Sequence, residues 1–235
     1  MTENKQIKSK ERVAEHGEVF TNQREVNAML DLVKQETERI DSRFLEPACG
    51  DGNFLAEILN RKLTVCTSKY GNSHADWEKY SVIAVSSIYG VDIMEDNAKE
   101  CRNRLYEIWD KAYSKACGKD CNDLCCESVK YILSKNILYG DALTMKQNDG
   151  KPIIFAQWDF VMGNLIKRAD YRLDELLEGQ DKHKGDHEVL SLFGDDENNF
   201  EHPKDWIYDD ETKAYIPAPI KEYPPTDYRQ LKEVK

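Results

Sequence analysis

Four polar side chains in this sequence stand where a short apolar run ends. Glu46 closes the run FLE, Asp92 closes IYGVD, Asp141 follows NILYG, and Asn164 follows WDFVMG. Oxygen atoms in such places can accept hydrogen bonds from a ligand, because the carboxyl ends of buried parallel strands meet at one edge of a sheet. Whether these groups act together depends on the sheet that the rest of the chain builds.

The chain alternates short apolar runs with helical patterns. Strands are predicted at 43–48, 88–92, 136–140 and 158–162. Helices are predicted to start at 54 and 98 and to cover 77–85 and 124–133, after a first helix that a capping box at Asn22 and Glu25 begins. We therefore predict an α/β fold with a doubly wound, Rossmann-like parallel sheet.

The loop after the first predicted strand has the composition of a nucleotide-binding turn. It is EPACGDG at 46–52, and its glycines let the backbone turn sharply and approach a ligand. A nicotinamide cofactor is disfavoured, because Leu55 stands where a dinucleotide fingerprint needs its third glycine. Asp92 is placed to accept from two ribose hydroxyls and Asp141 from an exocyclic amine. Together these features predict an adenosine-containing ligand.

Five motifs follow one another along the chain: GEVFTN (17–22), FLEPACGDGNFL (44–55), YGVDIMEDN (89–97), NILYGDAL (136–143) and WDFVMGN (158–164). In this order they resemble the motifs of S-adenosylmethionine-dependent DNA adenine-N6 methyltransferases of the restriction-modification type. The resemblance covers roughly residues 13–164 and implies S-adenosylmethionine as cofactor and adenine in DNA as substrate. It implies that Glu46 meets the methionine ammonium, and it assigns cofactor contacts to Phe20, Thr21, Glu46, Pro47, Ala48, Cys49, Gly50, Asp92, Ile93, Asp141 and Ala142.

The same resemblance makes Asn164 the catalytic residue. In the family mechanism a flipped adenine donates its N6 hydrogens to this side chain and to the next carbonyl, that of Leu165. The family continues with Pro-Pro-aromatic, whereas this chain continues with Leu165-Ile166-Lys167. Lys167 cannot stack on a base, which forfeits about 1 to 3 kcal/mol of base binding. Phe160 and Tyr171 are candidate substitutes for the missing ring.

The charge of the chain is concentrated in one segment. Residues 174–211 hold 14 acidic side chains against three lysines, which accounts for the whole net charge of −11. The remainder is neutral, so Lys167, Arg168 and Arg172 form either a phosphate-contacting patch for DNA or a solvated face.

Two regions are expected from this composition. Residues 1–173 form the methyltransferase-like domain, and residues 174–235 form an acidic, proline-containing tail, partly extended over it. Only 71 residues follow Asn164, which are too few for three further strands and a target-recognition region. The sheet is therefore predicted to be incomplete after the fourth strand, whose exposed edge invites a second protein chain or a second copy.

Cysteines and histidines at four-residue spacing give no zinc signature. Cys117, Cys121 and Cys125, with Cys126 adjacent, lack the usual two intervening residues, and half-buried thiols are the simpler interpretation. His183 and His187 lie in a polar, acidic stretch. No metal is predicted. The seven cysteines, with no signal-peptide pattern and no apolar stretch long enough for a bilayer, indicate a cytoplasmic protein without a membrane span.

Three functions remain open from the sequence. The first is a site-specific DNA adenine methyltransferase. The second is a catalytically impaired module or subunit that binds S-adenosylmethionine and acts through a partner protein. The third is a methyltransferase for RNA, protein or a small molecule, because one fold serves all of these substrates.

Overall fold

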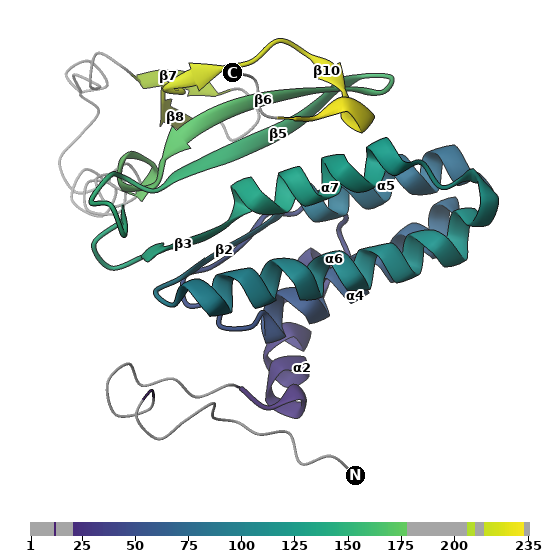
Figure 1. Cartoon of the computed structure of the whole chain (residues 1–235), viewed down its shortest axis with the longest axis horizontal. Helices are drawn as coiled ribbons and strands as arrows, with labels where there is room; N and C mark the ends of the chain where they lie inside the picture. Colours follow the sequence, from purple (N-terminus) through teal and green to yellow (C-terminus); the bar gives the residue numbers. More distant parts are fainter. Residues whose placement is uncertain (1–11, 13–20, 178–205, 210–213, 233–235) are drawn as a thin grey trace, which may run out of the picture.

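A mixed, mainly parallel sheet lies at one end of the long helices (Figure 1). The computed structural model describes Arg12 and residues 21–177, 206–209 and 214–232. The sheet has the order β1-β2-β3-β4, and its strands are β1 (Phe44–Glu46), β2 (Ile88–Asp92), β3 (Ile137–Asp141) and β4 (Lys146–Gln147). The first three strands run parallel, as predicted, and β4 pairs antiparallel with β3. The protein is therefore α/β with a mixed four-stranded sheet, compatible with a Rossmann-like fold.

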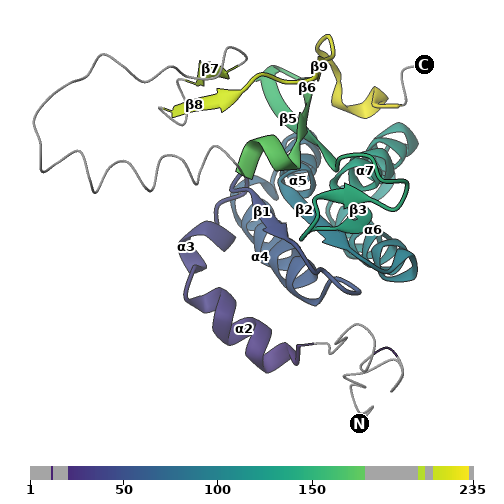
Figure 2. The same ribbon diagram turned by 90° about the vertical axis from the view of Figure 1, so that its left-hand side faces the viewer.

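Each crossover between parallel strands is a pair of helices. The helices are α4 (Asn53–Tyr70) and α5 (His74–Ser86) between β1 and β2, and α6 (Glu95–Cys117) and α7 (Asp123–Asn136) between β2 and β3, after α2 (Gln23–Asp31) and α3 (Lys34–Thr37). Side-chain caps begin several of them: Asn22, Ser73 and Asn122 each accept a hydrogen bond from a backbone N–H of the first turn. Figure 2 faces the carboxyl ends of β1, β2 and β3, with the long helices behind them.

The apolar spacing of α6 explains why the four long helices pack together. Cys101, Leu105, Trp109 and Tyr113 recur every four residues, and all are fully buried. Trp109 stacks on Tyr113 with ring centroids 4.6 Å apart, and its Nε1 donates to Ser81 Oγ on α5 (2.9 Å). A buried indole therefore keeps its hydrogen bond while it fills the space between helices.

The predicted fourth parallel strand is wrong. Residues 158–162 belong to β5 (Ile154–Met162), which pairs antiparallel with β6 (Leu165–Arg172) in a separate sheet. Gly163 has the positive φ (+57°) that a two-residue hairpin turn with glycine first requires, and Asn164 is the second turn residue. Trp158 fixes β5 against the helices, because its Nε1 donates to the Oδ1 of buried Asn136 (2.8 Å). β5 is thus an edge strand of the antiparallel sheet, while β1 is the outer strand of the parallel one.

The described end of the chain packs on the hairpin. The remaining strands are β7 (Trp206–Asp209) and β8 (Ala214–Pro217), which pair with each other, and β9 (Lys221–Glu222) and β10 (Thr226–Asp227), which both pair with β6. The 3-10 turn η2 (Tyr228–Gln230) follows, and Tyr228 is fully buried in the main core. Residues 218–232 of the predicted tail therefore pack directly against the preceding domain. Within the described parts of the chain, no helix has the length and apolarity to cross a membrane.

A buried lysine joins the start of the parallel sheet to α4. Lys62 is fully buried, and its Nζ donates to the carbonyls of Ile40 (3.1 Å) and Ser42 and to Ser87 Oγ (2.5 Å). Burial disfavours the ammonium form and lowers the pKa of Lys62 to about 7. The amine therefore titrates near neutrality while it holds two loops in place.

Replacing Lys62 by methionine is expected to change how stability depends on pH. Between about pH 7 and 10.5 the unfolded chain holds a proton on Lys62 that the folded chain has lost, so the free energy of unfolding rises with pH in this window. The free energy of unfolding of the wild-type chain should rise by up to about 1.4 kcal/mol per pH unit relative to that of Lys62→Met. Urea denaturation of both proteins at pH 7, 8 and 9 measures this difference, and parallel stability curves would contradict it.

Candidate functional site

The loop after β1 turns on two glycines with positive φ, Gly50 (+53°) and Gly52 (+90°). The Cys49 N–H donates to the Val91 carbonyl (2.9 Å) and so continues the pairing of β1 with β2. A Cβ on Gly52 would lie 2.7 Å from Cys101 Sγ, so this position excludes larger residues. A hydrogen bond with Cys101, together with burial, holds the pKa of the Cys49 thiol far above its usual range. Helix α4 and helix α6 therefore close tightly beneath the loop.

Asp92, at the carboxyl end of β2, binds the glycine loop directly. Its Oδ2 accepts from the Gly50 N–H (2.8 Å), and its Oδ1 accepts from the Met94 N–H (2.9 Å) and from Asn97 Nδ2 (3.1 Å). The residue is 6% exposed. The predicted proximity of the glycine loop and the Asp92 carboxylate is thus what the structure shows.

The hydrogen bonds already made limit what Asp92 can offer a ligand. A carboxylate has about four acceptor positions, and the protein occupies three of them. The sequence predicted that Asp92 accepts hydrogen bonds from two ribose hydroxyls. Only one acceptor position, on Oδ2, remains, so the carboxylate has room for one such hydrogen bond.

Glu46 lies at the neighbouring strand end and has no hydrogen-bond partner within the described residues. Its strand register opposes Gly90, two residues before Asp92. The side chain is partly buried, and desolvation raises its pKa. A partly desolvated carboxylate without a partner favours a cationic ligand group, since a nearby positive charge offsets the cost of its own ionisation.

The third strand end is more open. Asp141 is partly exposed, and its carboxylate accepts from the Leu143 N–H (2.9 Å) and from Thr144 Oγ1 (3.0 Å), which lowers its pKa. Ile93 is 51% exposed beside Asp92, and Ala142 is half-buried. These two apolar side chains follow adjacent strands, where a flat base could lie.

The remaining predicted cofactor residues have different placements. Pro47 and Ala48 are exposed in the turn after β1. Thr21 is half-buried, and its carbonyl accepts from Asn53 Nδ2 (3.2 Å) in the first turn of α4. Phe20 lies outside the described residues.

Asn164 lies at the opposite end of the molecule from Asp92. Its carbonyl accepts from the Tyr228 N–H (3.0 Å), and the Tyr228 hydroxyl donates to Glu78 (2.8 Å), near the start of α5. From Glu78 the helix runs for about 12 Å toward β2, and the strand continues for about 13 Å to Asp92. Figure 1 shows the turn between β5 and β6 over the helical end, away from the loops that follow β2 and β3. The predicted catalytic group is therefore separated from the predicted cofactor site.

The three basic residues on β6 are all ion-paired. Lys167 contacts Glu222 (2.7 Å), Arg168 contacts Asp170 (2.6 Å), and Arg172 contacts Asp174 (2.6 Å). Arg168 also lies over the Tyr223 ring, 4.4 Å from its centroid. Local carboxylates offset these charges, which weakens the case for a phosphate-binding patch there.

Two residues at this site were not predicted from the sequence. Asn97 is 1% exposed and holds Asp92, and Arg12 donates to Asn97 Oδ1 (3.2 Å). The signal for Asn97 was its place in the first turn of the helix after the strand, where a side chain can reach back to the strand end. No local pattern marks Arg12.

The cysteines near the ends of α6 and α7 do not form a metal site. Cys117 and Cys125 are buried, Cys126 is half-buried and Cys121 is exposed. No group of three or more histidine, cysteine or acidic side chains within the described residues has an arrangement that could hold a metal ion.

The fold and the strand-end site together define an α/β protein whose two-glycine loop is hydrogen-bonded to the Asp92 carboxylate. Comparisons of the chain with protein-family models, curated protein sequences and solved structures found no match.

Proposed function

We propose that this chain binds S-adenosylmethionine at the carboxyl ends of β1, β2 and β3, as a module related to the DNA adenine-N6 methyltransferases. The observation that carries the proposal is the hydrogen bond from the Gly50 N–H to Asp92, which joins a two-glycine turn to a strand-end carboxylate. Glu46 at the neighbouring strand end has no hydrogen-bond partner in the part of the chain that the structure describes, and its partly desolvated carboxylate suits the ligand's ammonium group. Ile93 and Ala142 supply apolar contacts for its adenine.

We propose further that the chain alone does not methylate adenine. Methyl transfer needs the acceptor nitrogen about 3 to 3.5 Å from the methyl carbon, in line with the sulfonium. Asn164 would have to orient that nitrogen, and its turn lies beside Tyr228 at the helical end. This separation favours the binding module over the enzyme. DNA and a second protein chain, as partners, stay predictions.

Calorimetry and a transfer assay test the two parts of the proposal. Titration with S-adenosylmethionine and with S-adenosylhomocysteine should show binding with one site per chain, and NAD should not bind. Incubation with tritiated-methyl cofactor and unmethylated duplex DNA should leave the DNA unlabelled. Asn164→Ala should bind the cofactor as tightly as the wild-type chain.

Each alternative has its own outcome. Label in duplex DNA that disappears with Asn164→Ala would establish the adenine methyltransferase and contradict the module. Label in RNA or protein but not in DNA would favour a methyltransferase for those substrates. Failure to bind either cofactor form would overturn the proposal as a whole.

A further inference from the structure

Arg12 is connected to the candidate ribose-binding carboxylate through one intervening side chain. The Arg12 guanidinium contacts Asp96 in the first turn of α6, with Nη1 2.6 Å from Oδ2 and Nη2 3.2 Å from Oδ1. Nη2 also donates to Asn97 Oδ1 (3.2 Å), and Asn97 Nδ2 donates to Asp92 Oδ1 (3.1 Å). A continuous set of hydrogen bonds therefore runs from Arg12 to Asp92, although 80 residues separate them in sequence.

Two hydrogen bonds, to Asp92 and from Arg12, orient the Asn97 amide. The nitrogen faces a carboxylate and the oxygen faces a guanidinium, so each end of the amide meets the charge that it prefers. An amide rotated by half a turn would point its oxygen at the Asp92 carboxylate, which is repulsive. Because Asn97 is 1% exposed, water does little to compensate for such a rotation. Arg12 stabilises the orientation in which Asn97 donates to Asp92.

We propose that Arg12 is a positioning residue for ribose recognition at this site. By fixing the Asn97 amide, it keeps Asp92 Oδ1 engaged and leaves the remaining acceptor position of Oδ2 facing a ribose hydroxyl. The inference rests on the proposed function, since it assumes that the adenosine moiety of S-adenosylmethionine binds there. The inference adds Arg12 to the residues of the proposed site, and it predicts that Asp92 recognises a single ribose hydroxyl.

The alternative is that Arg12 only attaches the start of the chain to α6 through Asp96. In that case its loss would weaken all ligands by the same factor. A positioning role instead affects only ligands that carry the recognised hydroxyl. Comparing ligands with and without each ribose hydroxyl separates the two roles.

The experiment measures competition with S-adenosylhomocysteine by adenosine, 2′-deoxyadenosine and 3′-deoxyadenosine. For the wild-type chain, one of the two deoxynucleosides should bind about 10-fold more weakly than adenosine, and the other should bind nearly as well. In Arg12→Met the 10-fold ratio should fall to about 2-fold. Arg12→Lys, which keeps the charge beside Asp96 without the guanidinium fork, should give an intermediate ratio.

Arg24→Met is the matched control, because Arg24 is an exposed arginine on α2. It should leave the ratio unchanged, and the melting temperatures of the variants should confirm that they fold. An unchanged ratio in Arg12→Met, with or without uniformly weaker binding, would overturn the positioning role and leave the proposed function intact. Absence of S-adenosylhomocysteine binding by the wild-type chain would overturn both.

Discussion

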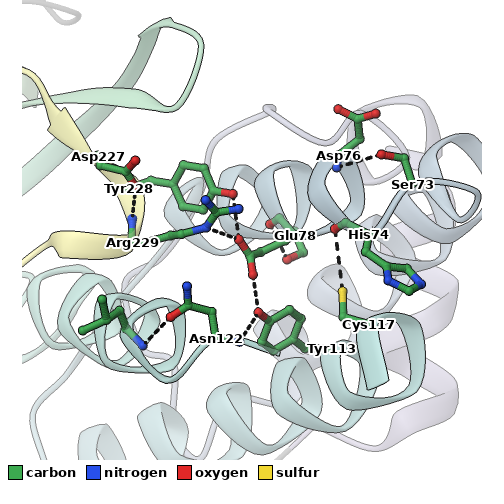
Figure 3. Close-up of polar contacts among 12 residues, drawn as sticks. Ser73, His74, Asp76, Glu78, Tyr113, Cys117, Asn122, Asp227, Tyr228 and Arg229 are labelled. Carbon is green, nitrogen blue, oxygen red and sulfur yellow. Dashed lines mark hydrogen bonds and ion pairs between the residues drawn. The ribbon is translucent and has the colours of Figure 1, made fainter. Parts of the chain in front are cut away.

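Replacing Glu78 by alanine is expected to lower the free energy of unfolding by about 4 kcal/mol, because it removes the shared partner of several buried polar groups. Glu78 is 3% exposed and lies on α5. The Tyr228 hydroxyl (2.8 Å) and Arg229 Nε (2.5 Å) donate to its Oε1, and the Tyr113 hydroxyl donates to its Oε2. Figure 3 shows this carboxylate between residues of the C-terminal segment and of α6.

The size of the expected loss in stability follows from the polar groups that would lose their partner in Glu78→Ala. Arg229, whose side chain is 29% exposed, would lose its ion pair with Glu78, and the buried Tyr228 hydroxyl would lose its acceptor. The pKa of Tyr228 is raised by burial and by its bond to Glu78, so the hydroxyl stays protonated and needs an acceptor. Unsatisfied buried groups of this kind cost about 1 to 3 kcal/mol each.

Urea denaturation and hydrogen exchange measure this prediction. The C-terminal amides that bond to the hairpin, those of Ile220 and Tyr223, should lose protection in Glu78→Ala before the helices do. Glu127→Ala is the matched control, since Glu127 pairs with Lys130 on an exposed helix face, and it should cost less than about 0.5 kcal/mol. A loss below 1 kcal/mol in Glu78→Ala would show that Glu78 does not anchor the C-terminal segment.

Replacing Asp92 by alanine is expected to weaken S-adenosylmethionine binding by at least about 100-fold and to cost about 3 kcal/mol of stability. The carboxylate accepts from the Gly50 N–H, the Met94 N–H and Asn97 Nδ2. Its loss removes one of the hydrogen bonds that hold the glycine loop to β2 and leaves these donors unsatisfied. The proposed ribose acceptor disappears with the same substitution, so loop geometry and ligand contact fail together.

The substitution Asp92→Asn separates the effect on the geometry of the glycine loop from the effect on the contact with the ligand. The amide preserves the shape and one acceptor oxygen, but its nitrogen would face an existing donor. We expect an intermediate loss of stability, with binding still reduced by about 10-fold or more. Asp149→Ala, in an exposed turn where Asp149 pairs with Lys151 (2.7 Å), serves as the control and should change neither property. Calorimetric titration measures the affinity of each variant for the cofactor, and urea denaturation measures its stability. Unimpaired binding by Asp92→Ala would show that Asp92 is not part of the site.

The parallel part of the fold could be predicted because its patterns are local. Buried residues every four positions along α6 specify an amphipathic helix wherever that helix lies. Gly50 and Gly52 carry the positive φ that the turn after β1 needs. A polar residue at the end of a buried strand is expected at the edge of the sheet, beside such a turn. The contact between Asp92 and the glycine loop follows from this geometry.

The position of Asn164 could not be obtained from the strand pattern alone. An apolar run such as 158–162 fits a parallel or an antiparallel neighbour equally well. Gly163-Asn164 between two strand-forming runs was a hairpin signal, and it agrees with the turn in the structure. The resemblance to the methyltransferase motifs favoured the other pairing, which the structure does not contain.

The sequence by itself determined the first three strands, the helices between them and the turn that meets Asp92, since neighbouring residues specify each of these. Only the tertiary structure decided that β5 leaves the parallel sheet, that Tyr228 reaches Glu78 and that Arg12 reaches Asn97. The last two contacts join residues 150 and 85 positions apart, and their free energy depends on burial that exists only after the chain has folded.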